Sequence, residues 1–329
     1  MGCEEFRRGR QWHLAASLVG MSLAPDYGTL GTAVFWLGFG AGILDMVRSP
    51  IVAVLNSQRR SASLNWLHSF YCLGAVLTIL ASTLALQVGF DWRHACLVLL
   101  PLPLVLLLAF TALRFPGLVH GFEKTGRLPL RRLMGVPWFL GALIAIALGG
   151  GTELGMAQWL PAYAEISLGF PKWLGGTALL LFSVAMAGAR MAVGGMGHRV
   201  DPFLLMAWCC VSSVLLFLLG SFMPIPTWAL AACVAVGFTG SPLWPTLLAV
   251  AADRYPAGGA SMFAALAAFG NAGGILMPWV VGWIGDLADL HWGLAVSALA
   301  PLLMLPLILR LRTVSSTSPE LARQAPDGS

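Results

Sequence analysis

The stretch LVLLPLPLVLLLAFTA, residues 97–112, is apolar on every side of any regular backbone. A strand of a membrane barrel would alternate apolar and polar residues over about ten positions, and this segment shows no alternation. Runs of about 20 such residues recur along the chain between short charged loops, which suits a hydrocarbon layer roughly 30 Å thick. The stretch therefore predicts helices that span a membrane.

Composition supports this interpretation over the whole chain. Of 329 residues, 58% are apolar and 10% are charged, whereas about a quarter are charged in an ordinary soluble domain. The cysteines lie mostly inside apolar runs, without the two-plus-two spacing of a zinc site, so we interpret them as small buried hydrophobes and expect no metal centre or cofactor. They are Cys3, Cys72, Cys96, Cys209, Cys210 and Cys233.

Ten apolar runs bounded by charges, Pro or Gly are the predicted membrane spans. They cover residues 12–25, 30–54, 64–88, 92–113, 134–161, 172–192, 203–222, 228–249, 260–285 and 291–309. The prediction is an all-α helical bundle in four parts: an N-terminal half of four spans (1–114), a basic linker (115–133), a six-helix C-terminal half (134–312) and a disordered tail (313–329).

Lys and Arg lie on one side of the predicted spans, and the exceptions in the loops are Arg93 and Lys172. Because cytoplasmic loops retain positive charge, both termini and the linker are predicted to be cytoplasmic. The net charge of +5 is spread over many loops, which argues against a nucleic-acid partner and for a lipid bilayer. Charge counting identifies no particular organelle.

Four ionisable residues are predicted well inside spans, where a charge costs at least a few kcal/mol. Asp45 and Arg48 are three positions apart on one helical face, and Arg48 and His68 should reach similar depths in neighbouring spans. We therefore predict that Asp45, Arg48 and His68 form either a coupling network that responds to protonation or a static ion pair.

Glu153 is the fourth of these residues and the stronger candidate for a proton carrier. No basic residue lies within a turn or two of it in the sequence, so we predict an unpaired carboxylate. The preceding run Gly149–Gly151 is expected to loosen the helix, and Gln158 and Trp159 offer a polar group and an aromatic face nearby. The alternative is a protonated Glu153 that bonds a neighbouring helix.

Asn271 lies near the middle of the ninth span, among Gly270, Gly273 and Gly274. Small residues let helices approach closely, so this stretch is first a packing surface. We interpret Asn271 either as a hydrogen bond between helices or as a substrate contact. Three tryptophans are interpreted as anchors and packing residues or, alternatively, as platforms for a sugar ring: Trp36, Trp66 and Trp244.

Two short patterns resemble the basic loop of the major facilitator superfamily, which ends in Asp-Arg-x-Gly-Arg. In the first, Phe6 stands at the Asp position before the basic run Arg7 to Arg10; in the second, Gly194 is followed by His198 and Arg199. The resemblance implies gating loops that contain Arg8, Gly9, Arg10, Arg190, Gly194 and Arg199.

Further motifs resemble the fucose-permease-like branch of this superfamily. Spans 30–54 and 64–88, with Asp45 and His68, look like its fourth and fifth helices, although an expected Asn and Pro are absent. Span 134–161 is similar to the seventh, in which Glu precedes Trp-Leu-Pro-x-Tyr. The resemblance implies that the first two helices of the family are missing from this chain.

These motifs predict a secondary active transporter of a small polar solute, with a sugar as one interpretation, by alternating access. The coupling ion, a proton or Na⁺, is left open. The alternative is a non-transporting truncated paralogue or a gene-model fragment. An enzyme is disfavoured because the sequence has no His-Glu-x-x-His and no pair of membrane Asp residues on adjacent turns, and direct use of ATP because it has no Gly-x4-Gly-Lys-Ser/Thr loop.

Overall fold

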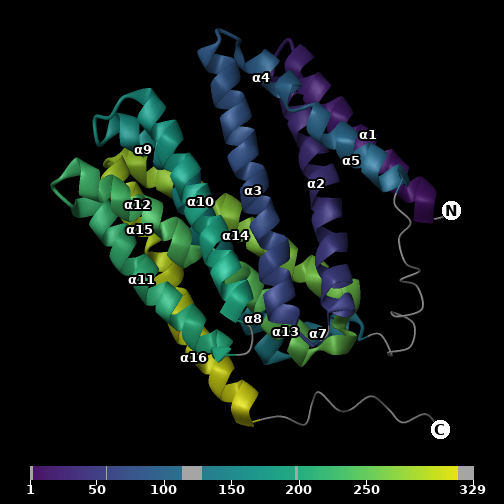
Figure 1. The fold of residues 1–329 in the computed structure, drawn as a ribbon. Helices are drawn as coiled ribbons and strands as arrows, with labels where there is room; N and C mark the ends of the chain where they lie inside the picture. The colour runs from purple at the N-terminus through teal and green to yellow at the C-terminus, as the bar shows by residue number, and fades with distance from the viewer. Residues whose placement is uncertain (1–2, 57, 113–127, 197–198, 318–329) are drawn as a thin grey trace. The chain divides into compact units, whose positions relative to one another are not determined.

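The computed structural model describes residues 3–56, 58–112, 128–196 and 199–317. Every regular element within these ranges is a helix (Figure 1). The elements are α1 (Cys3–Leu23), α2 (Tyr27–Leu55), α3 (Arg60–Gln87), α4 (Trp92–Val98), α5 (Pro101–Ala112), α7 (Leu130–Leu133), α8 (Pro137–Ala157), α9 (Leu160–Ile166), α10 (Lys172–Met196), α11 (Pro202–Phe222), α12 (Pro226–Gly240), α13 (Leu243–Arg254), η2 (Pro256–Gly258), α14 (Gly259–Leu287), α15 (Leu290–Ser297) and α16 (Leu299–Thr317).

Eight helical stretches in the described ranges are long and apolar enough to cross a membrane. They are Arg60–Ala85, Trp92–Ala109, Pro137–Ile166, Lys172–Met196, Pro202–Phe222, Pro226–Arg254, Pro256–Leu287 and Leu290–Ser316, and they coincide with eight of the predicted spans. The other two predicted spans correspond to the shorter apolar stretch His13–Leu23 of α1 and to α2. The prediction of an all-α membrane bundle is confirmed.

Several helices begin at residues that satisfy their free backbone N–H groups. The Asp201 carboxylate accepts from the N–H groups of Phe203 and Leu204 at the start of α11, and Asp289 does the same for Trp292 at the start of α15. Proline occupies the first turn of α8, α9, α11 and α12, where its missing N–H removes no helical hydrogen bond. Local chemistry at the interfaces therefore sets where these spans start.

Contacts divide the chain into two units, which are described separately. Unit 1 comprises Met1–Arg48 and Gly74–His120, and unit 2 comprises Ser49–Leu73 and Gly121–Ser329. Unit 2 therefore contains the first part of α3 together with all helices from α7 onward. The prediction divides the chain at the linker 115–133 instead. These contact-based units do not test that division, which stays a prediction.

Two predicted segments differ from the structure or lie partly outside it. The predicted disordered tail is wrong for residues 313–317, because α16 continues to Thr317. Residues 318–329 lie outside the described part of the chain, as do residues 115–127 of the predicted linker. The last linker residues form the short helix α7.

The core of unit 2 is built around α8, which packs against α14 through glycines. A Cβ at Gly273 would overlap the carbonyl oxygen of Ala147, and one at Gly150 would overlap that of Gly270. The glycine run at 149–151 was expected to loosen the helix, and this was wrong: α8 is continuous from Pro137 to Ala157. These glycines instead let two helix backbones approach closely.

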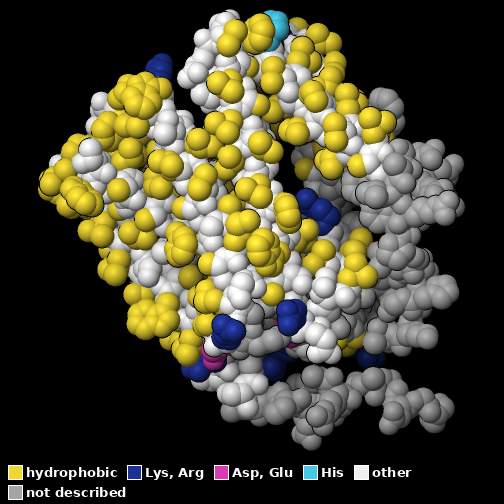
Figure 2. Space-filling model, in the orientation of Figure 1, with side chains coloured by type: hydrophobic (Ala, Val, Ile, Leu, Met, Phe, Trp, Pro, Cys, Tyr) yellow, Lys and Arg dark blue, Asp and Glu magenta, His cyan; other side chains and the backbone are white. Residues whose placement is uncertain are grey.

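The outer surface of the helices is apolar, as a membrane protein requires. Figure 2 shows hydrophobic side chains along the length of the visible face, whereas Lys and Arg gather mainly near the end that carries α7 and the end of α16. Exposed side chains include Trp208 and Ile275, which are 70% and 74% accessible. In water such a surface would be unfavourable, but in hydrocarbon it is the expected one.

Candidate functional site

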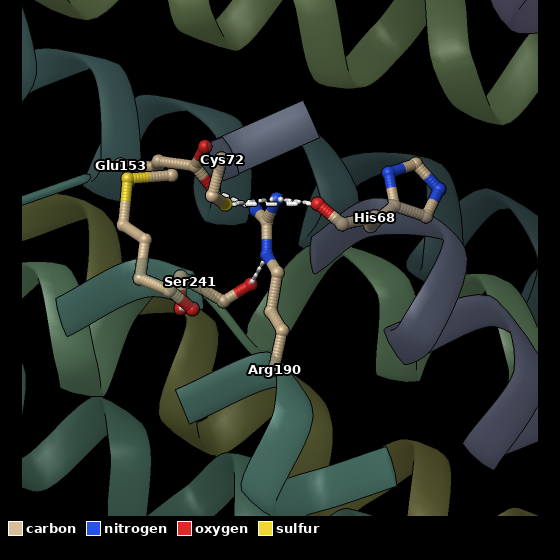
Figure 3. A network of polar contacts seen from close by, with 6 residues as sticks. His68, Cys72, Glu153, Arg190 and Ser241 are labelled. Carbon is tan, nitrogen blue, oxygen red and sulfur yellow. Dashed lines mark hydrogen bonds and ion pairs between the residues drawn. The ribbon is translucent and has the colours of Figure 1, made fainter. Parts of the chain in front are cut away.

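Arg190, on α10, is the centre of a buried polar network in unit 2 (Figure 3). Its Nη2 donates to Glu153 Oε2 on α8 over 2.6 Å. The two side chains are only 3% and 8% accessible, so this ion pair is largely shielded from solvent. Charge-assisted hydrogen bonds of this length are among the strong ones in proteins.

The remaining donors of Arg190 join two further elements to the pair. Its Nε donates to the carbonyl oxygen of Ser241, between α12 and α13, over 3.0 Å. Its Nη1 donates to the carbonyl oxygen of His68 over 3.0 Å and to the Cys72 sulfur over 3.3 Å, both on α3. One guanidinium therefore connects α3, α8, α10 and the α12–α13 junction.

The electrostatics of this arrangement depend on Glu153. A lone charge at membrane depth is expensive, whereas a paired Arg and Glu form a neutral unit with its hydrogen bonds satisfied. Arginine keeps its proton under all ordinary conditions, so a proton added to the pair goes to the carboxylate. Such a proton would leave Arg190 as a buried cation held by neutral acceptors.

The structure corrects the prediction of an unpaired Glu153. Its partner, Arg190, lies 37 positions away on another helix. A window of one or two turns around Glu153 could not reveal this partner. Arg190 itself was assigned by resemblance to a gating loop, but its side chain is 2% exposed and lies in the protein core.

The predicted cluster of Asp45, Arg48 and His68 stays a prediction. The side chain of Asp45 lies outside the described residues, and Arg48 and His68 belong to different units. The His68 ring places Nε2 3.5 Å from the Ser49 hydroxyl. Figure 3 shows this ring turned away from the guanidinium, while the His68 carbonyl oxygen faces it. His68 therefore enters the network through its backbone.

The two residues predicted to assist Glu153 have different surroundings. Gln158 is exposed at the end of α8. Trp159 donates from Nε1 to the carbonyl oxygen of Pro278 over 2.8 Å, and its ring lies against Gly282. This contact fastens the end of α8 to α14, so the ring is not a free aromatic face.

Within the described part of the chain, Asn271 does not form the predicted hydrogen bond between helices. Its side chain is exposed, and no hydrogen bond of it occurs among the described residues. The neighbouring glycines make the contact instead, as the Gly273 backbone lies against Ala147. The other interpretation, a substrate contact, stays a prediction.

The gating-loop residues are described only in part. The side chains of Arg8, Gly9 and Arg10 lie outside the described residues, although their backbone belongs to α1. Arg199 is exposed, and His198 lies outside the description. A Cβ at Gly194 would lie 2.8 Å from Cδ1 of Trp66, so this glycine provides the space for the Trp66 indole.

Several residues of this region carried no signal in the sequence. Cys72 is buried as predicted, but its sulfur also accepts a hydrogen bond from Arg190. Arg60 donates from Nη1 to Asp253 Oδ1 over 3.0 Å, and Asn65 Nδ2 lies 3.5 Å from Thr246 Oγ1. With the contacts of Trp66 and Arg190, these form a seam that fastens the first part of α3 to α10 and α13.

Unit 1 contains a separate open groove of about 490 Å³ between α1 and α2. Trp36, one of its lining residues, stacks on His13 with ring centroids 6.3 Å apart. The other lining residues are small, hydroxylated or aliphatic. The groove lacks an ion pair, so the network around Arg190 is the stronger candidate site.

A family model identifies the class of protein. The model of the Major Facilitator Superfamily matches residues 9–262, which is more than half of the chain. This chain belongs to the Major Facilitator Superfamily. The membership confirms the family resemblance seen in the sequence, and it makes the chain a multi-pass integral membrane protein of a transporter family.

Curated relatives of this superfamily member are distant. A Protein TsgA homolog of Serratia proteamaculans (strain 568) is 25% identical over 159 residues, which cover 47% of this chain and 40% of that protein. A second, of Erwinia tasmaniensis, is 22% identical over 301 residues, which cover 86% and 72% of the two chains. The match thus spans less than half the length of the Serratia protein.

Solved structures of the superfamily share the fold. The transporter FucP in the outward conformation superposes with a TM-score of 0.72 at 16% identity, covering 94% of this chain and 83% of that one. The human organic anion transporter MFSD10 gives a TM-score of 0.71 at 16% identity, covering 93% and 77%. At this identity the likeness shows the fold alone.

Proposed function

We propose that this chain is a secondary active transporter of a small polar solute, driven by protons and working by alternating access. The observation that carries the proposal is the bonding of Arg190, which holds Glu153 at one side of its guanidinium and the backbone of α3 at another. Membership of the superfamily and the fold shared with FucP support it. A variant of the E. coli FucP, also with a TM-score of 0.72, is named a fucose:proton symporter, which favours a sugar as solute.

Alternating access requires contacts between the two predicted halves that form and break. Helix α3 belongs to the predicted N-terminal half, whereas α8, α10 and α13 belong to the C-terminal half. The seam at Arg60, Asn65, Trp66 and Arg190 joins them in this conformation. By the positive-inside rule this seam lies toward the cytoplasm, so its opening would give the inward-facing state.

Protonation of Glu153 supplies the coupling step. A proton on the carboxyl removes its negative charge, which weakens the bond from Arg190 Nη2 and leaves the guanidinium an unpaired buried cation. The cost of that cation favours any movement that brings Arg190 to water or to another acceptor. Because Arg190 also holds the His68 carbonyl, such a movement pulls on the α3 seam.

A second candidate function follows from the same geometry. Arg190 bonds four different groups of the protein, and a guanidinium satisfied in this way also suits a static strut between helices. The protein would then be a non-transporting member of the family. Transport by the unmodified chain, and its dependence on a proton acceptor at Glu153, separate the two candidates.

The test uses the purified chain in liposomes with an inward proton gradient. For one proton per solute, a difference of about one pH unit supports about tenfold accumulation. Radiolabelled L-fucose is the first probe, followed by other neutral monosaccharides. Glu153→Gln, which mimics the protonated form, should abolish accumulation driven by pH but retain exchange of labelled for unlabelled sugar.

The matched control is Glu165→Gln on α9, whose carboxylate is 41% accessible and lies 3.6 Å from Lys172 Nζ. This variant should behave like the unmodified protein. Uptake that persists unchanged in Glu153→Gln would remove Glu153 from the mechanism. If the unmodified chain moves none of the sugars, the non-transporting candidate is favoured.

A further inference from the structure

Trp244 carries a buried polar atom that neither the ion pair nor the α3 seam explains. Its indole Nε1 is shielded from solvent and has no hydrogen-bond partner among the described residues. A buried donor without an acceptor costs free energy, and most such groups in native proteins are paired. The N–H of Trp244 is therefore expected to meet an acceptor at some stage of the working cycle.

The six-membered part of the same indole is fixed by packing. A Cβ at Gly150 would lie 3.1 Å from Cζ3 of Trp244, and a Cβ at Gly270 would overlap this edge of the ring. Both glycines leave room for the indole and for nothing more. The ring is thus wedged between α8 and α14, and stacking of a sugar on it, one interpretation from the sequence, is disfavoured in this conformation. The N–H is the part of Trp244 that this packing leaves without a partner among the described residues.

The position of Trp244 connects it with the proposed transport site. It follows Ser241, whose carbonyl oxygen binds Arg190, by three residues. Gly150, against which the indole lies, is one helical turn before Glu153 on α8, a rise of about 5 Å. The six-membered part of the indole therefore lies about one turn of α8 from the residue that carries the carboxylate.

We propose that Trp244 is a substrate-binding residue whose indole N–H donates to a hydroxyl oxygen of a neutral polyhydroxylated solute. A hydroxyl group both accepts and donates, so it can take the bond from Trp244 while it or its neighbour donates to Glu153. Glu153 and Arg190 already form a neutral pair, so a neutral solute adds no net charge to this buried site. The proposal rests on the proposed transport function and names the class of solute for that site.

Access to the N–H requires movement. Nε1 is covered in this conformation, so the solute reaches it when α13 separates from the helices that face it. The contact then forms in an occluded or inward-facing state. A donor that is unpaired in one state and bonded to solute in the next favours the passage between them.

The test compares L-fucose uptake by the full chain in liposomes with uptake by Trp244→Phe. Loss of one neutral hydrogen bond should raise KM about tenfold and leave the maximal rate within about twofold. A second variant carries 3-benzothienylalanine at position 244, which keeps the ring shape and replaces N–H by sulfur; it should show the same rise. Trp208→Phe is the control, because this indole is 70% exposed on the lipid-facing side of α11.

Monodeoxy analogues of L-fucose identify the hydroxyl. One analogue should bind the unmodified protein about tenfold more weakly than L-fucose, yet bind Trp244→Phe as well as L-fucose does. An unchanged KM in both position-244 variants overturns the assignment of Trp244 while transport stands. If the unmodified protein moves no neutral sugar, the proposed solute class fails together with this assignment. A drop in thermal midpoint for Trp244→Phe alone, with an unchanged KM in the benzothienyl variant, also overturns it, since the role would then be packing.

Discussion

Replacing Arg190 by Met tests whether the buried ion pair holds unit 2 together. The change leaves Glu153 without its partner at a position where the carboxylate is 8% accessible. Breaking a buried pair by removing one member costs about 3–5 kcal/mol. The carbonyl oxygen of Ser241 also loses its bond from Nε, at about 1 kcal/mol. Arg190→Met should therefore destabilise the protein by about 4–6 kcal/mol.

The double variant tests whether the stability loss comes from the unpaired charge of Glu153. Arg190→Met with Glu153→Gln removes both charges, so the protein should be more stable than with Arg190→Met alone by about 2 kcal/mol. Unfolding in mixed micelles, followed by tryptophan fluorescence, measures each free energy. Arg60→Met is the control: its partner Asp253 is 57% accessible, so losing this pair and the bonds to the carbonyl oxygens of Ala53 and Ala252 should cost about 1–3 kcal/mol, less than losing the buried pair.

The reasoning is refuted if Arg190→Met costs no more than Arg60→Met, or if the two changes at Arg190 and Glu153 are additive. Either result would mean that water reaches the guanidinium and screens the pair. The measurement requires no knowledge of the solute. It therefore separates the stability of the network from its part in transport.

Two further substitutions test the packing around the site. Gly273→Ala should destabilise by about 1–3 kcal/mol, because its Cβ would overlap the Ala147 carbonyl oxygen; Gly176→Ala, where a Cβ meets nothing, is the control in the same unfolding assay. Tyr163→Phe should cost about 1 kcal/mol, because the Tyr163 hydroxyl donates to the Gly220 carbonyl oxygen over 2.7 Å. Equal stability of the Gly273 and Gly176 variants, or an unchanged Tyr163→Phe, would contradict the respective contact.

The spans could be predicted because hydropathy is a local property. An apolar run such as residues 203–222 must leave water wherever the rest of the chain lies, and α11 occupies almost the same range, Pro202–Phe222. The end of α16 was missed because its last residues carry no strong local signal. Ser and Thr favour neither helix nor tail strongly, and the helix continues through them to Thr317.

Of the buried ion pair, the sequence identified Glu153 as a candidate residue at membrane depth but did not identify its partner. Glu153 was identified because a carboxylate inside an apolar span needs a reason to be there. Its partner was not, because Arg190 looked like part of a loop motif and lies 37 positions away. Cys72 was interpreted as a plain hydrophobe, and nothing in its neighbourhood along the chain indicates a hydrogen bond from an arginine on α10.

The effect of the glycines on α8 also depended on tertiary packing and could not be predicted from the local sequence. The run at 149–151 predicted a loosened helix, since glycine lowers helix propensity. In the folded chain the close approach of α14 decides the matter, and α8 remains continuous through Gly150. A sequence pattern cannot distinguish these outcomes, because both use the absence of a Cβ.

The sequence alone determined the class of protein, the approximate limits of eight membrane helices and the presence of a carboxylate at membrane depth. These follow from transfer of side chains between water and hydrocarbon, which depends on each segment by itself. Only the tertiary structure decided that Glu153 is paired, that Arg190 also holds α3, and that the Trp244 indole is wedged between glycines. These depend on which helices become neighbours, and side chains far apart in the chain choose their partners only once the helices have packed.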